Sequence, residues 1–511
     1  MIVILDFGGQ FVHLIARRIK DFGASARILP YATPAAEIKK LKPVGIILSG
    51  GPAAITGKNA IHPDYKIFEL GVPILGICYG EQMIAHHFGG KLAFRGDQRQ
   101  YGKEMMKTSK HSELFKGMKT DEQVWMSHGD AVTQLPAGFE ITGSTEKCPI
   151  AAFENRARKL YGLQFHPEVA HTLNGSKMYE NFVYNVCGAR KDYSLKGLDQ
   201  LLISEIQKDA KGAGVLIAVS GGVDSLVTAA LIHKAVPEQL YSVFIDTGLM
   251  RKGEVEETEK FFKQMGFRHF EMINASAIFL GKLKGVIDPE QKRKIIGHTF
   301  IEVFEKKARE LGKKAAIGYL AQGTIYPDRI ESAQASKAAD KIKSHHNLTL
   351  PEKMNLKLIE PLKELYKDEV RALGELVGLP KLRVWRQPFP GPGLAIRIVG
   401  EVTPENVRIV READFIFRDE IAKAGLEDKI WQYFAALLPI KTVGVMADER
   451  TYEYIITLRA VTSKDGMTAD WAKIPYDVLE KISSRISNDV RGVNRVVYDV
   501  SQKPPATIEY E

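Results

Sequence analysis

A cysteine flanked by glycines stands where an apolar run meets a helical pattern. Cys78 lies in the stretch GICYG (76–80), directly after the apolar residues 72–75. This is the spacing of a nucleophile elbow, in which small flanking residues let the backbone turn sharply and lift the nucleophile above a sheet. The positive end of the following helix would favour the reactive thiolate. The turn alone leaves open the alternative of a buried, inert cysteine.

A thiolate nucleophile needs a base, and His166 is the histidine best placed to serve as one. In the stretch QFHPE, Pro167 keeps the backbone extended and Glu168 follows two residues after the histidine, near the same face. We therefore predict a catalytic triad of Cys78, His166 and Glu168. Taken alone, His166 would more often be a satisfied core histidine, and the elbow and the carboxylate together reverse that balance. Three other histidines either lie on the helix after the cysteine, pointing away from its start, or lack an orienting carboxylate: His86, His87 and His128.

A second glycine-rich turn combines phosphate-binding backbone with a carboxylate. The stretch SGGVDS follows the apolar run 215–219 and opens a helical pattern. Successive N–H groups in such a turn form an anion-binding nest at a helix N-terminus. The turn lacks the lysine and the spacing of a kinase-type P-loop, and its Asp224 suggests Mg²⁺ shared with bound phosphates. A plain turn capped by Asp224 and Ser225 is the alternative. The predicted ATP- and pyrophosphate-binding residues are Ser220, Gly221, Gly222, Val223, Asp224 and Ser225.

The surrounding elements predict an α/β protein. Short apolar strands alternate with amphipathic helices from the start of the chain to about residue 190, and again from residue 214. This alternation indicates two consecutive doubly wound parallel-sheet domains. Beyond a cluster of prolines and glycines, the pattern changes to that of a small α+β C-terminal domain. We place the domains at residues 1–190, 191–385 and 386–511.

Composition narrows the class of protein further. A chain of 511 residues is long enough for about three or four domains. Its three cysteines are odd in number and far apart, which favours a reducing cytoplasm and excludes a zinc-knuckle spacing. We see no signal peptide and no apolar stretch of the ~20 residues needed to span a bilayer, so we expect no membrane partner. The net charge of +9 suits either nucleic acid or a phosphorylated substrate, and its even spread along the chain favours the substrate.

Four motifs in the first domain resemble those of class I glutamine amidotransferases: DFGGQ, SGGP, GICYG and QFHPE, in this order. The resemblance implies hydrolysis of glutamine through a γ-glutamyl thioester on Cys78, with release of ammonia. It also implies an oxyanion hole built from Gly50, Gly51 and the N–H of Tyr79, a role that backbone donors suit. The stretch SGGVDS resembles the pyrophosphate loop of ATP pyrophosphatases, which cleave ATP to AMP and pyrophosphate.

Across essentially its whole length the chain resembles the family of glutamine-hydrolysing GMP synthases. Among the matching stretches are DPEQKRKIIG (288–297), AQGTIYPDRIES (321–332), KSHHN (343–347) and PFPGPGLAIRI (388–398). The resemblance implies that XMP is adenylated on its oxygen 2 by ATP and that ammonia displaces AMP to give GMP. It implies Mg²⁺ with ATP, no tightly bound organic cofactor, no nucleic-acid partner, and a homodimer formed through the C-terminal domain.

The same resemblance implies four XMP-binding residues: Arg293 in a mobile lid, Asp448, Lys503 and Glu509. Their types suit a phosphate, ribose hydroxyls or a purine edge. A solvated charge run around Arg293 and an ordinary disordered tail are the alternatives. Two positions depart from the family pattern: Ala447 stands where the family usually has glycine, and Tyr510 where it has tryptophan. A positive φ at Ala447 would cost about 1 kcal/mol.

Two rival interpretations remain. The first is another enzyme with the same ATP loop, such as an NAD synthetase or a tRNA-thiolating enzyme. A thiolating enzyme would need further cysteines in the adenylating part, and none follows Cys187. The second rival is a basic nucleic-acid-binding or regulatory protein on a retired enzyme scaffold. That interpretation predicts lost catalytic residues, whereas the candidates are all present: Cys78, His166, Glu168, Asp224 and Asp328.

Overall fold

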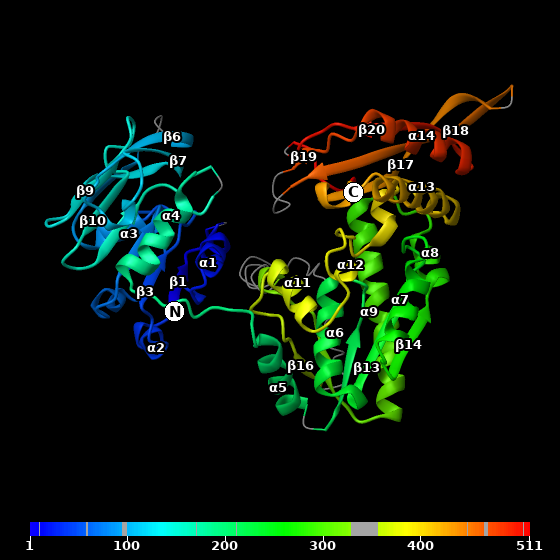
Figure 1. Ribbon diagram of the computed structural model, residues 1–511, viewed down its shortest axis with the longest axis horizontal. Helices are drawn as coiled ribbons and strands as arrows, with labels where there is room; N and C mark the ends of the chain where they lie inside the picture. The colour runs from blue at the N-terminus through cyan, green and yellow to red at the C-terminus, as the bar shows by residue number, and fades with distance from the viewer. Residues whose placement is uncertain are drawn as a thin grey trace. The chain divides into compact units, whose positions relative to one another are not determined.

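The computed structural model forms two compact units, Met1–Ser194 and Leu195–Glu511 (Figure 1). The first predicted boundary, after residue 190, falls just before this division. The second, after residue 385, does not coincide with a division into compact units. The structure describes residues 1–9, 11–57, 60–94, 100–169, 171–210, 212–328, 356–446, 448–463, 469–503 and 505–511. Within these ranges, no helix is long and apolar enough to cross a membrane.

The first unit contains a nine-stranded mixed sheet of order β2-β1-β3-β4-β11-β10-β9-β6-β7. Its parallel half comprises β1 (Ile2–Asp6), β2 (Ala26–Pro30), β3 (Gly45–Leu48), β4 (Ile74–Ile77) and β11 (Leu160–Leu163). Its antiparallel half comprises β6 (Gln100–Thr108), β7 (Asp121–His128), β9 (Glu140–Ser144) and β10 (Ala152–Asn155). A small second sheet pairs β5 (Lys91–Phe94) with β8 (Asp130–Gln134). The α/β class is confirmed, with a parallel core extended by antiparallel strands.

Helices cover both faces of this sheet, because its central strands carry apolar side chains on both sides. Along β1, Ile2 and Ile4 join one hydrophobic cluster while Val3 and Leu5 join the other. The first cluster includes α1 (Val12–Asp21) and α4 (Gly175–Glu180), which a π-helix (Asn181–Val186) continues. The second includes α2 (Ala35–Lys40) and α3 (Tyr79–His87). This packing fixes the start of α3, the helix that follows Cys78.

The second unit begins with a five-stranded, fully parallel sheet of order β14-β13-β12-β15-β16. Its strands are β12 (Gly214–Ala218), β13 (Leu240–Asp246), β14 (His269–Asn274), β15 (Ile317–Ala321) and β16 (Lys357–Ile359). The strand order reverses at β12, which pairs with β13 on one side and β15 on the other. The carboxyl end of such a strand is a topological switch point, where open α/β sheets bind their ligands. The SGGVDS turn follows β12 at this point.

Seven helices of the described residues accompany this sheet, and its two faces belong to different hydrophobic clusters. The helices are α5 (Leu198–Ala210), α6 (Val223–Ala235), α7 (Glu254–Gln264), α8 (Ser276–Leu283), α9 (Pro289–Lys314), α11 (Lys367–Leu376) and α12 (Lys381–Val384). One cluster holds the apolar sides of α5, α6, α7 and α11, and the other those of α8 and α9. The predicted doubly wound arrangement is confirmed here.

The rest of this unit is the predicted α+β tail. A sheet of β17 (Gln432–Met446), β18 (Glu449–Thr462), β19 (Asp470–Trp471) and β20 (Val493–Asp499) packs with α13 (Pro404–Lys423) and α14 (Tyr476–Asp489). Apolar side chains of the tail, such as Val410 and Leu458, share one hydrophobic cluster with Leu216 and Leu320 of the parallel sheet. The proline- and glycine-rich break leads into a buried 3₁₀ turn, Gly393–Arg397, and does not form an exposed linker. The shared cluster explains why residues 195–511 form one compact unit.

Candidate functional site

The backbone at Cys78 has the strained conformation expected of a nucleophile elbow. Cys78 has φ 49° and ψ −103°, a combination that a non-glycine residue rarely adopts, and it connects β4 directly to α3. The flanking glycines make this turn possible. A Cβ at Gly76 would lie 2.4 Å from the Gly80 carbonyl oxygen, and one at Gly80 would lie 2.4 Å from the Leu48 carbonyl oxygen. The sequence alone predicted this elbow.

His166 and Glu168 form a buried hydrogen-bonded pair. The His166 Nδ1 atom lies 2.7 Å from Glu168 Oε1, and the Tyr179 hydroxyl donates to Glu168 Oε2 at 3.2 Å. Thr172 Oγ1 donates to the His166 carbonyl oxygen at 2.6 Å and so fixes the backbone of the histidine. Tyr179 and Thr172 were missed from the sequence, because nothing local distinguishes a helical tyrosine eleven residues downstream from a core residue.

Burial by itself would lower the pKa of His166, but the Glu168 carboxylate and the Cys78 sulfur together outweigh it and raise the pKa to about 10. The histidine therefore holds a proton through neutral pH. A protonated imidazole beside the sulfur favours the thiolate. The arrangement can both attack a carbonyl carbon and return a proton to a leaving amine.

A glycine turn between β3 and the elbow lies against both reacting side chains. A Cβ at Gly50 would lie 3.2 Å from His166 Cε1 and 3.8 Å from Cys78 Cβ, and one at Gly51 would lie 2.7 Å from the Phe7 carbonyl oxygen. Ser49 holds the turn in place. Its Oγ accepts from the Phe7 N–H at 3.0 Å and donates to the Gly50 carbonyl oxygen at 2.9 Å.

Together these residues line a cavity of about 620 Å³, whose walls include Gly50, Gly51, Cys78, Tyr79, His166 and Glu168. A cavity of this size admits an amino-acid substrate. The structure thus brings together the whole predicted glutaminase set.

The rejected histidines have other surroundings. His87 stacks against both Tyr65 and Phe68, with ring centroids 4.3 and 4.9 Å away. His86 is exposed on the same helix. His128 does line the cavity, but its Nδ1 contacts the Asp130 backbone carbonyl oxygen at 3.0 Å, not a carboxylate.

The SGGVDS turn has its own internal hydrogen bonds. Ser225 Oγ accepts from the Ser220 N–H at 3.3 Å and donates to the Gly222 carbonyl oxygen at 3.0 Å. Gly221 has φ 78°, in the left-handed region. Gly222 is the N-cap of α6 and no side chain caps the helix there, so the plain capped turn is not what forms. Val223 begins the helix, whose N-terminal N–H groups are available to an anion.

Asp224 has a carboxylate suited to a hard cation. One oxygen pairs with Lys367 at the start of α11, and the other, Oδ1, is buried without a hydrogen-bond partner among the residues that the structure describes. An unpartnered carboxylate oxygen beside a phosphate-binding turn is the kind of ligand Mg²⁺ takes, because this ion needs only one or two carboxylates when phosphates supply further oxygens. Among the described residues no cluster of three or more potential metal ligands occurs. The residues present therefore fit a metal carried with a nucleotide.

Three of the four predicted XMP-binding residues gather around the C-terminus. Glu509 accepts hydrogen bonds from Arg397 at 3.2 Å and from Gln432 at 2.6 Å. Arg293, near the start of α9, donates to the Glu511 carbonyl oxygen at 2.5 Å. Lys503 pairs through its backbone with Ala469, which packs in the same small cluster as Ile508.

Asp448 lies elsewhere in the unit. It is exposed at the tip of the β17–β18 hairpin, whereas Glu509 contacts Gln432 at the first residue of β17. That strand has 15 residues, and an extended strand of this length spans about 45–50 Å. The length of β17 therefore lies between Asp448 and the contact of Glu509 with Gln432. Among the described residues of this turn, Asp448 has a positive φ of 66°. Ala447, where we expected a cost, lies outside the described residues.

The structure accommodates Tyr510, the second departure from the family pattern. The Tyr510 hydroxyl donates to Asp499 Oδ2 at 2.9 Å and lies 2.9 Å from Thr457 Oγ1. The ring therefore keeps a packed position and gains hydrogen bonds that an indole could not make in the same way.

Comparison with known proteins gives matches along the whole chain. Residues 3–186 match the family model of class-I glutamine amidotransferases. Residues 195–291 match the NAD synthase family, and residues 419–510 match the GMP synthase C-terminal domain. Curated relatives named GMP synthase [glutamine-hydrolyzing] from Clostridium botulinum, Clostridium novyi and Bacillus cytotoxicus are each 54% identical to this chain. Each alignment covers 100% of this chain and 99% of the relative.

Proposed function

The chain belongs to the family of glutamine-hydrolysing GMP synthases, and we propose that Cys78, His166 and Glu168 form its glutaminase site. The reaction is the glutamine-dependent amination of XMP to GMP, with cleavage of ATP to AMP and pyrophosphate. The observation that carries the assignment of residues is the strained elbow at Cys78, which shares a cavity with a histidine hydrogen-bonded to a buried carboxylate.

In the glutaminase half, the Cys78 thiolate attacks the side-chain carbonyl carbon of glutamine. The oxyanion that forms accepts hydrogen bonds from backbone N–H groups of the Gly50–Gly51 turn and of Tyr79. Protonated His166 gives its proton to the departing nitrogen, so that ammonia leaves and a thioester remains on Cys78. His166 then takes a proton from water, whose oxygen attacks the thioester and releases glutamate. Glu168 keeps the imidazole oriented throughout.

In the synthetase half, oxygen 2 of XMP attacks the α-phosphorus of ATP, and pyrophosphate departs into the turn 220–225. Ammonia then attacks carbon 2 of the purine, and AMP leaves with the oxygen. Mg²⁺ bound with ATP would neutralise phosphate charge, and Asp224 is the residue that would hold it. Arg293, Lys503 and Glu509 bind XMP, and their grouping near the C-terminus supports this role.

The NAD synthetase alternative does not account for the whole chain. Its family match covers residues 195–291, which carry the ATP loop common to both kinds of enzyme. The match of residues 419–510 to the GMP synthase C-terminal domain distinguishes the two.

We also propose that the protein is a homodimer in the cytoplasm. The distal β17–β18 hairpin supports the dimer, because apolar side chains on it are exposed: Ile440, Val443, Val445 and Tyr452. Free cysteines at all three positions support a reducing compartment.

The decisive experiment is the substitution Cys78→Ala. Glutamine-dependent formation of GMP should fall to background, while formation from added ammonia should stay within about twofold of wild type, because the synthetase residues are untouched. The assay supplies XMP, Mg-ATP and either nitrogen source, and measures GMP, AMP and pyrophosphate. Loss of both activities in a folded variant would refute the division of labour, and ADP as product would refute adenylation.

A further inference from the structure

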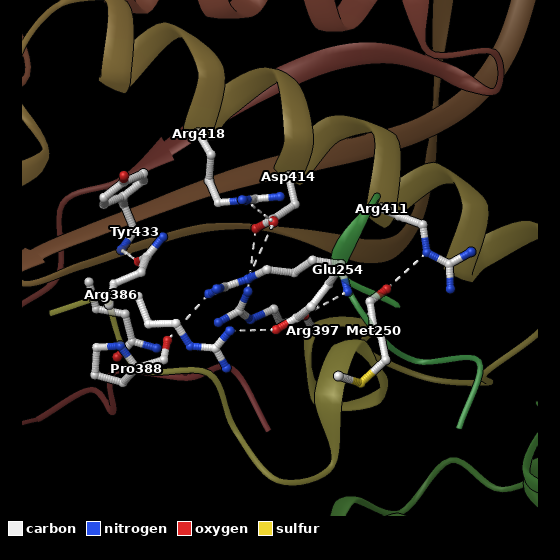
Figure 2. A network of polar contacts seen from close by, with 12 residues as sticks. Met250, Glu254, Arg386, Pro388, Arg397, Arg411, Asp414, Arg418 and Tyr433 are labelled. Atoms are coloured by element: carbon white, nitrogen blue, oxygen red, sulfur yellow. Dashed lines mark hydrogen bonds and ion pairs between the residues drawn. The ribbon is translucent and has the colours of Figure 1, made fainter. Parts of the chain in front are cut away.

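The segment Arg386–Phe389 joins the pyrophosphate turn to the C-terminal part of the unit, although the prolines and glycines of the stretch that it begins predicted a boundary. Arg386 donates from Nη1 to Glu254 Oε1 at 2.9 Å and from Nη2 to the carbonyl oxygen of Gly221, within the SGGVDS turn. Gln387 accepts from the N–H of Tyr433 in β17 at 2.8 Å. Figure 2 shows the guanidinium of Arg386 turned towards Glu254. We call this segment the strap.

The bond from Arg386 to Gly221 sets the orientation of one peptide group in the turn. In a trans peptide the C=O and the following N–H point in opposite directions. With its carbonyl oxygen held by Arg386, the Gly221–Gly222 peptide directs the Gly222 N–H away from the strap. That N–H is one of the donors of the anion-binding nest, and within the turn it makes a long contact of 3.4 Å to Ser220 Oγ. Gly221 has a positive φ and no side chain to restrict its backbone. Without the bond from Arg386, the Gly221–Gly222 peptide would therefore flip easily.

Beyond Glu254, the contacts continue through buried charged residues to Asp414 and Arg397, which Figure 2 shows, and from Arg397 to Glu509. Glu254 Oε2 accepts from the backbone N–H of Arg251 at 3.2 Å, and the Arg251 guanidinium forms an ion pair with Asp414 at 3.9 Å. Asp414 also pairs with Arg397 at 3.3 Å. Arg397 in turn donates from Nε and Nη2 to the two carboxylate oxygens of Glu509, each at 3.2 Å.

The strap contributes directly to the middle of this chain. The Arg251 guanidinium donates to the Pro388 carbonyl oxygen at 3.3 Å. The Phe389 ring lies near two guanidinium groups. Its centroid is 4.4 Å from the Cζ atom of Arg251 and 5.2 Å from the Cζ atom of Arg397. The chain therefore runs from the pyrophosphate turn to Glu509 through backbone and side-chain contacts, and its longest step is the 3.9 Å ion pair between Arg251 and Asp414.

Burial makes this chain stiff. The exposed fraction of Arg397 is 0%, of Asp414 1%, of Glu254 5% and of Arg251 7%. Each buried charge must keep its partner, since an uncompensated one costs several kcal/mol. Burial lowers the pKa of Arg251 to about 10 while Asp414 opposes the shift, so the guanidinium keeps its charge at neutral pH. A shift of one member therefore obliges its neighbours to move.

We propose that Arg386 is a positioning residue for the pyrophosphate turn, and that the chain Glu254–Arg251–Asp414–Arg397 links this turn to Glu509, so that the ATP and XMP subsites are set together. The inference rests on the proposed function, because it takes the turn and Glu509 as substrate-binding parts. It adds residues that touch neither substrate but fix the groups that do.

The first test compares Arg386→Gln, Arg386→Lys and the matched control Arg383→Gln in the full-length protein. Arg383 is a neighbouring arginine whose direct contacts are to Glu257 and Phe261, so its substitution removes a charge near Arg386 and Glu254 without breaking a bond to the turn. With ammonia as nitrogen source, Arg386→Gln should raise the KM for ATP and the inhibition constant of pyrophosphate at least about tenfold, with a smaller change in kcat. Arg386→Lys should recover part of the loss, because an ammonium cannot reproduce the forked pair of bonds.

Two results would overturn the positioning role: values for Arg386→Gln that match those for Arg383→Gln, or equal losses in the Gln and Lys variants. If Arg386→Gln fails to unfold cooperatively, Glu254→Gln replaces it. That variant keeps the side-chain shape, and it should raise the KM for ATP in the same direction by a smaller factor. An unchanged KM there would also refute the proposal.

The second test measures the link by a double-mutant cycle of Arg386→Gln and Glu509→Gln, scored as kcat/KM for XMP. Independent residues would give fold-losses that multiply. We expect the double variant to lose at least about threefold less than the product of the single losses, and a multiplicative result would refute the link. Failure of the proposed function is recognised separately, because wild type itself would then not convert XMP, ATP and ammonia to GMP, AMP and pyrophosphate.

Discussion

At the scale of single residues, the glutaminase site depends on a backbone conformation that the surrounding structure must hold in place. A non-glycine residue in such a region costs about 1–3 kcal/mol. Two backbone hydrogen bonds offset this cost, from the Cys78 N–H to the Leu163 carbonyl oxygen at 2.7 Å and from the Gln82 N–H to the Cys78 carbonyl oxygen at 3.0 Å. The strained residue is thus tied to β11 on one side and to α3 on the other.

The raised pKa of His166 leads to a pH-dependent prediction for Glu168→Gln. Loss of the carboxylate removes the strongest influence that opposes burial, so the pKa of about 10 should fall. The stability that the charged histidine contributes is fully present below pH ~6.5 and is lost as pH rises towards 10. Alkylation of Cys78 by iodoacetamide at pH 7 should therefore slow at least about tenfold in the variant, because less imidazolium supports the thiolate.

The matched control for this substitution is Glu180→Gln, which removes an exposed carboxylate that pairs with Lys177. Its alkylation profile between pH 5 and 10 should coincide with that of wild type. A Glu168→Gln profile that also coincides would show that the carboxylate does not tune the histidine.

Glu81 carries a buried carboxyl group that lowers the free energy of unfolding of the first unit. It is fully buried in α3, both of its oxygens lack a hydrogen-bond partner within the described part of the chain, and burial raises its pKa well above the usual range. The group stays neutral in the fold but ionises on unfolding above pH ~4.5, so its contribution to stability falls as pH rises. Glu81→Met should stabilise the first unit by about 1–3 kcal/mol, and by more at pH 8 than at pH 5.

Buried Cys148 provides the probe for that measurement, because all three cysteines lie in the first unit. Its labelling by a disulfide reagent across a urea series reports the unfolding of this unit alone. Glu81→Gln serves as the control, since it keeps a buried polar group but cannot ionise. Its stability difference from wild type should grow with pH as that of Glu81→Met does, and equal pH profiles for all three proteins would refute the assignment.

At the scale of elements, close approach between α3 and the sheet places the nucleophile. Gly76 of β4 and Gly162 of β11 are register partners, and both face α3. A Cβ at Gly162 would lie 2.7 Å from Glu81 Cγ, and one at Gly76 would touch the backbone of Gly80. The pair of glycines lets the helix start directly above the strand ends, where the cavity opens.

The β17–β18 hairpin yields a prediction about assembly. Val443 and Val445 share one face, because alternate residues of a strand do, and Tyr452 is the register partner of Val443. Their exposed fractions are 58%, 71% and 65%. Val445→Glu would place a charge on this apolar face, and we expect it to raise the dimer dissociation constant at least about tenfold.

Sedimentation velocity across a concentration series checks this prediction. Lys208→Glu, an exposed charge change on α5, is the control and should sediment as wild type does. A wild-type protein that sediments as a monomer at all concentrations would refute the dimer itself. Dimerisation unaffected by Val445→Glu would place the interface on another surface.

At the scale of the whole molecule, the two units have separate hydrophobic clusters. Among the described residues, the clusters of the first unit include none beyond Ala189, and those of the second include none before Leu198. We therefore expect residues 1–194 alone to fold, with a free energy of unfolding of about 5–15 kcal/mol. Cys148 in this fragment should resist labelling and become reactive in one cooperative urea transition. Labelling at the rate of an unstructured peptide would show that the unit needs the rest of the chain.

Short stretches of sequence determined the chemistry of this protein. The elbow at Cys78, the His166–Glu168 pair and the 220–225 turn could be predicted because each depends on the sterics and hydrogen bonding of a few consecutive residues. The βαβ alternation was predictable for the same reason, since buried parallel strands need apolar residues on both faces.

Only the tertiary structure decided which distant segments meet. It extended the first sheet with antiparallel strands and merged the tail with the second parallel sheet through one core. It placed Asp448 and Glu509 at opposite ends of β17. It also brought Arg386 to Gly221. These contacts depend on how apolar faces from segments far apart in the chain pack against one another, and packing of that kind leaves no local pattern in the residues that take part.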